Sequence, residues 1–209
     1  ICYSGIGLAV TGNTVIYSRS VYTGVTYGSL WIRDLVTLSG QTIANTDPGN
    51  DTNKDYAQNM VAGVHDGKGY LMISVDTSSN NNLSFDGSVD VYESSDPDHW
   101  VGNTSLKFTA WPPANDGTSA AWYGHSMGFD EESGYLVVGW SRSNMATGTS
   151  SGAVDIWDVK NATRVTTIYN PNIFGSTDND DFGGNPSQNK WTKIGITNRR
   201  ILVSAPSED

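Results

Sequence analysis

The stretch Leu136-Val137-Val138-Gly139 decides the fold, because the chain contains four versions of it. The other three are Val15-Ile16-Tyr17-Ser18, Leu71-Met72-Ile73-Ser74 and Ile201-Leu202-Val203-Ser204. Each version has three large apolar residues followed by a small one, and 65 residues separate Ser74 from Gly139 and Gly139 from Ser204. A near-constant period of this length is typical of a repeat architecture, in which each copy buries its faces against its neighbours.

Further strand patterns recur around this stretch. A segment that begins with Gly and a small residue follows it at 28–32, 87–92 and 152–157, and in the last two copies apolar and polar residues alternate, which is the period of a strand with one buried face. We expect another strand at 35–38 and 164–168, and a leading strand at 5–10, 60–64, 123–129 and 191–196. Four short strands per repeat predict an all-β protein, a partial β-propeller of four-stranded antiparallel blades with a repeat of about 60–65 residues.

The lead and apolar strands together resemble a known repeat family. Tyr123-Gly124-His125-Ser126-Met127, followed by Gly134-Tyr135 and the apolar stretch, is similar to the FG-GAP repeat of integrin-α-type propellers. The last copy runs from Trp191 to Ile194 and ends in Ser204-Ala205-Pro206, close to the Gly-Ala-Pro end of that family's strand. The resemblance implies a propeller that recognises its partner through loops. Blades of the WD40 and kelch types are shorter, at about 40–45 and 50 residues.

The repeat also divides the chain into units. We place them at about 1–55, 56–121, 122–188 and 189–209, of which the last is incomplete. Two complete and two partial units are too few to close a ring of six or seven blades. An open propeller would leave unpaired strand edges, which natural proteins avoid. We therefore expect contacts with the rest of a longer polypeptide or assembly, and the alternative is closure by self-association of such half-rings.

Charge and composition exclude several classes of partner. The chain has 12 basic and 22 acidic residues, a net charge of −10, and no basic cluster larger than Arg199-Arg200. Nucleic-acid binding needs a concentrated basic surface and is excluded. No apolar run reaches the 18 residues of a membrane span. Few charged residues (16%), many Ser, Thr and Asn, and 7 Trp with 10 Tyr are typical of an extracellular or virion-surface protein.

One motif has to be interpreted with care. Gly124-His125-Ser126-Met127-Gly128 satisfies G-x-S-x-G, the nucleophile elbow of α/β-hydrolases. The elbow needs a helix after the serine and a histidine further along the chain. Residues 129–134 instead indicate a turn before the next strand, and no histidine follows Ser126. We interpret the motif as a blade strand and expect no hydrolase activity from it.

Acidic loops are the best candidates for metal binding. Asp51, Asn53 and Asp55 place oxygen side chains at alternate positions, and Asp178 and Asp180 form a second oxygen-rich stretch. Calcium takes six to eight oxygen ligands, which such a loop can supply in part. FG-GAP propellers carry similar loops, but between the first two strands of a blade, whereas both stretches here precede a lead strand. Calcium at one of these loops is therefore one hypothesis, and solvated turn acids are the other.

Aromatic residues suggest a second kind of site. Trp100 and Trp111, with His99, lie in the long connection of the second repeat and are expected to be exposed, where indoles can stack on sugar rings. The stretch 95–100 is also faintly similar to the Asp-box, a structural turn of sialidase-like propellers. We expect cores between blades to include Leu71, Ile73, Leu136, Val138, Ile201 and Val203.

Two classes of function follow. The first is a non-catalytic structural, recognition or adhesion module on a cell or virion surface, which binds protein or glycan through loops at one end of the blades. The loops are expected at 76–86, 94–116, 142–151 and 170–190, where long polar segments vary between copies. The alternative is a glycan-active propeller enzyme, sialidase-like or a glycosidase, which would need paired carboxylates about 5–9.5 Å apart.

Overall fold

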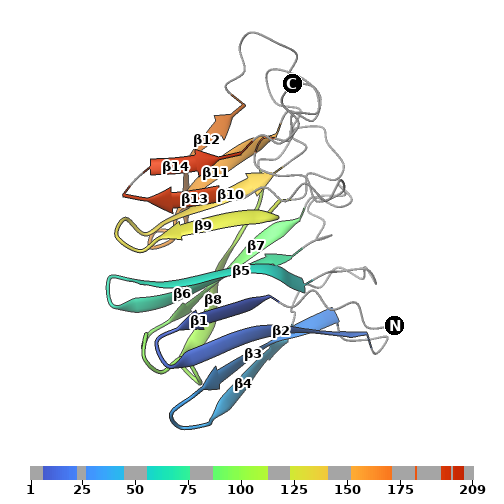
Figure 1. The fold of residues 1–209 in the computed structure, drawn as a ribbon, viewed down its shortest axis with the longest axis vertical. Helices are drawn as coiled ribbons and strands as arrows, with labels where there is room; N and C mark the ends of the chain where they lie inside the picture. The colour runs from blue at the N-terminus through green and yellow to red at the C-terminus, as the bar shows by residue number, and fades with distance from the viewer. Residues whose placement is uncertain are drawn as a thin grey trace.

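The computed structural model describes residues 7–22, 27–44, 56–75, 87–112, 123–140, 152–170, 182, 194–198 and 200–204, and within them the protein is all-β. Three four-stranded antiparallel sheets and one two-stranded sheet follow one another along the chain. Strands are hydrogen-bonded in chain order within every sheet, so each sheet is an antiparallel meander. Figure 1 shows the first strands of the four sheets, β1, β5, β9 and β13, in this order along the long axis of the molecule.

The strand bounds define the four sheets. The first sheet contains β1 (Leu8–Thr11), β2 (Thr14–Tyr22), β3 (Tyr27–Asp34) and β4 (Gly40–Ala44). The second contains β5 (Tyr56–His65), β6 (Lys68–Val75), β7 (Ser88–Ser94) and β8 (Thr104–Ala110). The third contains β9 (Ser126–Asp130), β10 (Tyr135–Trp140), β11 (Ala153–Asp158) and β12 (Thr163–Tyr169). The fourth contains β13 (Ile194–Thr197) and β14 (Arg200–Val203).

The recurring apolar stretch forms the same strand in each sheet. All four copies lie on the second strand, namely β2, β6, β10 and β14, although Ser204 falls just beyond β14. The segments that begin with Gly lie on the third strands β3, β7 and β11. The predicted repeat is confirmed. The strand expected at 35–38 is wrong: these residues form the turn before β4, and their side chains project into solvent, with Leu38 73% exposed.

The second strands β6 and β10 are apolar along their length because neighbouring sheets cover both of their faces. On β6, Leu71 and Ile73 belong to the core shared with the first sheet, whereas Met72 belongs to the core shared with the third. On β10, Leu136 packs toward the second sheet, and Val137 packs toward the fourth. A strand buried on both faces reads as a continuous apolar run rather than an alternating one.

The small residue that ends each apolar stretch has a structural role. The Ser18 hydroxyl accepts a hydrogen bond from the Gly7 N–H at 2.8 Å, and the Ser74 hydroxyl accepts one from the Asn59 N–H at 3.0 Å. At the third copy the Gly139 carbonyl accepts from Gly124 instead. A backbone donor of the leading segment is thereby satisfied at each of these three positions, and a large side chain there would displace it.

Glycines let each sheet approach the next. A Cβ on Gly87 would lie 2.7 Å from the Tyr123 carbonyl oxygen, and one on Gly152 would lie 2.0 Å from that of Phe182. Both glycines have positive φ, +72° and +79°. Phe182 is therefore the structural equivalent, in the fourth repeat, of Tyr123 in the third. The sequence pattern had predicted Trp191 at this position.

The sheets form a fan rather than a parallel stack. The first strands of successive sheets contact one another, β1 with β5, β5 with β9 and β9 with β13. The fourth strands β4, β8 and β12 make no such contacts among the described residues. First strands that converge while outer strands diverge are the arrangement of blades around a propeller axis, so the described chain is a partial β-propeller.

Candidate functional site

The two ends of the sheets differ in how much chain they carry. At one end β1 joins β2 through Gly12 and Asn13, and β5 joins β6 through Asp66 and Gly67. At the opposite end residues 76–87 and 141–152 connect second to third strands, and 45–55, 111–125 and 170–193 connect one sheet to the next. We call these the short-turn end and the long-connection end. Adjacent antiparallel strands need only a two-residue loop, so the extra chain at the long-connection end is not required by the fold.

This topology divides the loops that were predicted to share one surface. Residue 94 ends β7, residues 95–103 form the turn between β7 and β8 at the short-turn end, and 104–110 are β8 itself. The predicted site at 94–116 is therefore wrong as a single loop, because antiparallel strands bring alternate connections to opposite ends. Of the segments 76–86, 142–151 and 170–190, the structure describes only Asn170 and Phe182, and the strands that flank these segments end at the long-connection end.

Aspartates shape the short-turn end. Asp34 Oδ1 accepts hydrogen bonds from the Val36 and Thr37 N–H groups, both at 2.8 Å. Asp96 Oδ1 accepts from Asp98 and His99, at 3.0 and 3.1 Å, and Asp158 Oδ1 accepts from Asn161 at 3.0 Å. Asp34 and Asp158 are the last residues of third strands, and Asp96 lies two residues after one; neighbouring copies are 62 residues apart in the sequence. Such side-chain bonds to the backbone two or three residues ahead fix a turn.

A charged pair joins the first and second sheets at this end. His99 Nδ1 lies 3.1 Å from Asp34 Oδ2, and the Gly102 N–H donates to Gln41 Oε1 at 2.9 Å. Hydrogen bonds from the Thr37 backbone, His99 and the Val36 backbone lower the pKa of Asp34 to about 2. The same contact with Asp34 raises the pKa of His99. The two sheets are therefore linked through a histidine whose pKa is raised by its partner.

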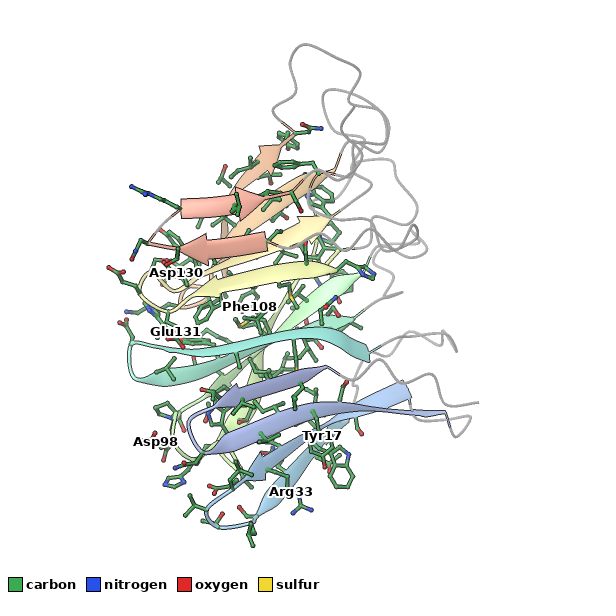
Figure 2. All side chains as sticks on the ribbon, in the orientation of Figure 1. Tyr17, Arg33, Asp98, Phe108, Asp130 and Glu131 are labelled. Atoms are coloured by element: carbon green, nitrogen blue, oxygen red, sulfur yellow. The ribbon has the colours of Figure 1, made fainter. Side chains whose placement is uncertain are left out.

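A second set of contacts joins the second and third sheets. Lys160 Nζ lies 2.5 Å from Asp66 Oδ2, an ion pair that lowers the pKa of Asp66 and raises that of Lys160. The Glu131 side chain accepts a hydrogen bond from the Val64 N–H at 2.8 Å, and its carbonyl lies 2.8 Å from His65 Nδ1. Figure 2 shows Asp98, Asp130 and Glu131 at this end of the sheets. The carboxylates of Asp66 and Glu131 therefore hold these two sheets together.

A buried polar network lies between the second and third sheets. Asp155 is fully buried, and its carboxylate accepts hydrogen bonds from Thr167 at 2.5 Å and from the Tyr123 hydroxyl at 3.1 Å. Trp157 Nε1 donates to the Tyr123 hydroxyl at 2.7 Å, and Arg164 lies 3.4 Å from the carboxylate. Burial raises the pKa of both Asp155 and Tyr123. The network satisfies its members internally, as a buried polar group requires.

The second sheet repeats the centre of this network. Thr109 donates to Asp90 at 2.7 Å, and the two residues face each other across β7 and β8 as Asp155 and Thr167 do across β11 and β12. Sequence reasoning noted the alternation of this strand but did not predict that its aspartate would be buried. The signal was present, because an aspartate recurs three residues after each of these two strand-initiating glycines.

The aromatic candidates do not form one exposed platform. Trp100 is fully buried, and its Nε1 donates to the Pro97 carbonyl at 2.9 Å, so the expectation of an exposed Trp100 is wrong. It fills space against Gly69, whose missing side chain leaves room for the indole. His99 is half-exposed and engaged with Asp34, and Trp111 is half-buried just after β8. Trp100 and His99 thus lie in the β7–β8 turn, at the short-turn end.

The structure does not describe the predicted calcium ligands. Asp51, Asn53, Asp55, Asp178 and Asp180 are all outside the described residues. Within the described part of the chain, no three His, Cys, Asp or Glu side chains are grouped so that they could hold a metal ion.

The G-x-S-x-G motif forms a strand. Ser126 begins β9, which leads through a turn into β10 without a helix. Ser126 is also 5% exposed, and Gly128 lies against the fourth sheet near Ile196. The interpretation of this motif as part of a blade is confirmed.

Comparison with known proteins gives limited similarity. No family model and no curated protein matches the chain. Among solved structures it is similar to an exo-β-1,3-galactanase from Phanerochaete chrysosporium, at 10% identity and a TM-score of 0.31, over 81% of this chain and 50% of that one. It is also similar to the GH43 protein BlXynB from Bacillus licheniformis, at 11% identity and a TM-score of 0.33, over 98% and 49%. The chain thus spans about half the length of these structures. The described residues include no helix long and apolar enough to cross a membrane.

Proposed function

We propose that this chain is a non-catalytic recognition or structural module that binds a protein or glycan at its long-connection end. The observation that carries the proposal is the unequal distribution of chain between the two ends of the sheets. Two-residue turns join β1 to β2 and β5 to β6, whereas residues 76–87 and 141–152 each join two adjacent strands. Long connections on a rigid β-scaffold are where recognition usually lies.

The carboxylates of the described sheets support binding rather than hydrolysis. In the described first strands β1, β5, β9 and β13, Asp130 is the one acidic residue, and its carboxylate accepts a hydrogen bond from Ser133 at 2.6 Å. These strands converge toward the propeller axis. A glycosidase needs two carboxylates facing each other across its substrate. The convergent strands of this part of the ring supply neither a pair nor a free carboxylate.

The repeat itself fits the FG-GAP type, which we propose as its relationship. The supporting observation is the packing of Tyr123-Gly124 and of Phe182 against the preceding sheet. The Tyr123 backbone lies close to Gly87, and the Phe182 backbone lies close to Gly152. The sequence resemblance predicted an aromatic residue followed by glycine at Tyr123-Gly124; for the last copy it placed the aromatic residue at Trp191, whereas Phe182 occupies the equivalent position.

The experiment shortens the long connections and leaves the blades intact. Residues 76–86 and 141–151 are replaced by Asn-Gly, with Gly87 and Gly152 retained, so that each connection becomes a three-residue hairpin with glycine at its positive-φ position. We expect an unchanged circular dichroism spectrum and loss of binding on a glycan array and a protein array. Replacement of Leu35 and Val36 by serine, at the short-turn end, is the control and should leave binding unchanged.

Two results would contradict the proposal. If both shortened variants keep the full binding profile of the parent protein, the long-connection end is not the recognition surface. If the purified protein releases reducing sugar from any of a panel of polysaccharides, it is a glycan-active enzyme and the proposal of a non-catalytic module is wrong.

A further inference from the structure

Two asparagines at the short-turn end belong to a motif that the proposed recognition role does not use. Asn103-Thr104-Ser105 and Asn161-Ala162-Thr163 both satisfy Asn-x-Ser/Thr, in which x is not proline, the acceptor motif for N-linked glycosylation. Asn103 is the last residue of the turn between β7 and β8, and Asn161 lies in the turn between β11 and β12. The two motifs therefore occupy the same connection in two successive sheets.

The structure presents both motifs to solvent. Asn103 and Ser105 are exposed, and so are Asn161 and Thr163. In each motif the acceptor amide and the hydroxyl two residues further on thus lie at the surface, where the chain leaves a turn and enters a strand. A bulky, hydrated glycan needs such a position, because a buried attachment point would leave no room for the sugar.

The hydrogen bonds of the two amides are compatible with an attached sugar. Asn103 Nδ2 donates to the His99 carbonyl at 2.7 Å, and Asn161 Nδ2 donates to Asp158 Oδ2 at 2.7 Å. An asparagine side chain has two N–H donors, and each of these bonds needs one of them. Linkage to a sugar replaces one hydrogen on Nδ2 and leaves the other, so the modified side chain remains a donor.

Both acceptors also lie beside sheet edges. β8 and β12 are the outermost strands of their sheets, and among the described residues no strand pairs with their outer sides. Leu106 on β8 is 45% exposed, and Val165 on β12 is 51% exposed. Unpaired edges promote association with other chains, and natural proteins cover or interrupt them. A hydrated glycan near the start of such a strand hinders that association.

We propose that Asn103 and Asn161 carry N-linked glycans, and that the chain therefore passes through a secretory pathway that supplies the glycan donor. In this reaction Asn Nδ2 forms a bond to the anomeric carbon of an oligosaccharide held on a lipid pyrophosphate. The bond from that carbon to the pyrophosphate oxygen breaks, the lipid pyrophosphate leaves, and Nδ2 loses one proton. The inference goes beyond the proposed recognition role and does not depend on it.

The experiment produces the chain behind a cleavable secretion signal in cultured animal cells. Peptide N-glycosidase in heavy-oxygen water converts each occupied asparagine to labelled aspartate, and peptide mass spectrometry assigns the label to its position. We expect label at Asn103 and Asn161 in most copies. Ser105→Ala should remove it from Asn103 alone, and Thr163→Val from Asn161 alone. Asn13→Gln is the matched control, because Asn13 lies in the exposed β1–β2 turn outside any such motif, and it should change neither site.

The peptide map also separates these two sites from the motifs at Asn50 and Asn82, which lie outside the described residues. Circular dichroism before and after removal of the glycans verifies that the glycosylated protein is folded. Translation into microsomes gives the same readout if little protein is secreted. The proposal is overturned if either Asn103 or Asn161 stays unlabelled in the parent chain. It is also overturned if the label persists after loss of the motif hydroxyl, because the label then comes from deamidation.

Discussion

Single buried side chains carry the contacts between sheets, and Leu136 tests this directly. It is fully buried on β10, in the core between the second and third sheets. We expect Leu136→Ala to lower the free energy of unfolding by about 2–5 kcal/mol, because it removes apolar contacts and leaves a cavity. Urea denaturation measures the loss. Leu38→Ala, at an exposed turn position, should change stability by no more than about 0.5 kcal/mol. Equal effects of the two substitutions would contradict the assigned core.

The pair of Asp34 and His99 gives a pH dependence with a defined sign. The lowered pKa of Asp34 stabilises the folded protein above its ordinary value of 3.8, and this is lost as the pH falls toward about 2. The raised pKa of His99 stabilises it below 6.5, and this is lost as the pH rises through the raised value. The difference in melting temperature between the parent and His99→Gln should therefore be largest between about pH 4 and 6.5. A difference that grows above pH 8 would contradict the pairing.

At the scale of the element, glycines determine how closely two sheets approach. Gly87 and Gly67 have the same φ of +72°, but a Cβ at Gly87 meets the Tyr123 backbone whereas one at Gly67 meets nothing within 4 Å. Alanine at Gly67 should cost about 1–2 kcal/mol for the left-handed backbone alone. Alanine at Gly87 should cost about 1–3 kcal/mol more, because the added atom overlaps the next sheet. Urea denaturation of the two variants isolates this difference, and equal losses would refute the close contact.

Strands could be predicted from the sequence where the spacing of apolar residues reflects burial. They were harder to predict where a single side chain changes the direction of the backbone. The second strands β6 and β10 are covered on both faces, so their apolar runs were visible as parts of a repeat. Residues 35–38 are apolar enough to suggest a strand, but the Asp34 carboxylate captures two backbone N–H groups and turns the chain. Trp100 was expected in solvent because its connection is long and polar. Its burial depends on Gly69, which is distant in sequence, and spacing alone does not reveal that contact.

At the scale of the molecule, protection should be uneven across the sheets. All residues of β6 except Lys68 are buried, whereas most of β12 is exposed. Local opening is cheapest where few apolar contacts must break. In native-state hydrogen exchange we expect the amides of β6 to be the slowest and those of β12 to exchange much faster. Uniform protection across the two strands would contradict a fan in which β6 is buried between sheets and the outer strand β12 is exposed.

The order of the blades followed from the sequence because each sheet contacts mainly its neighbours along the chain. The candidate site did not follow as readily. Whether two loops share a surface depends on strand direction, and 95–103 proved to lie at the end opposite the connections that leave β6 and β10. The buried Asp155 was also missed, since an alternating strand pattern normally places its polar residues in water.

The unequal ends of the sheets have a consequence for how such a protein can diverge. Insertions and deletions in the segments that follow β6 and β10 enter between strands that are already paired, so they need not disturb any sheet-to-sheet contact. The turns at the opposite end tolerate changes in length less well, because their aspartate side chains also bridge neighbouring sheets. Two proteins built on this scaffold can therefore differ widely in length and still superpose strand for strand, with almost all of the difference at one end.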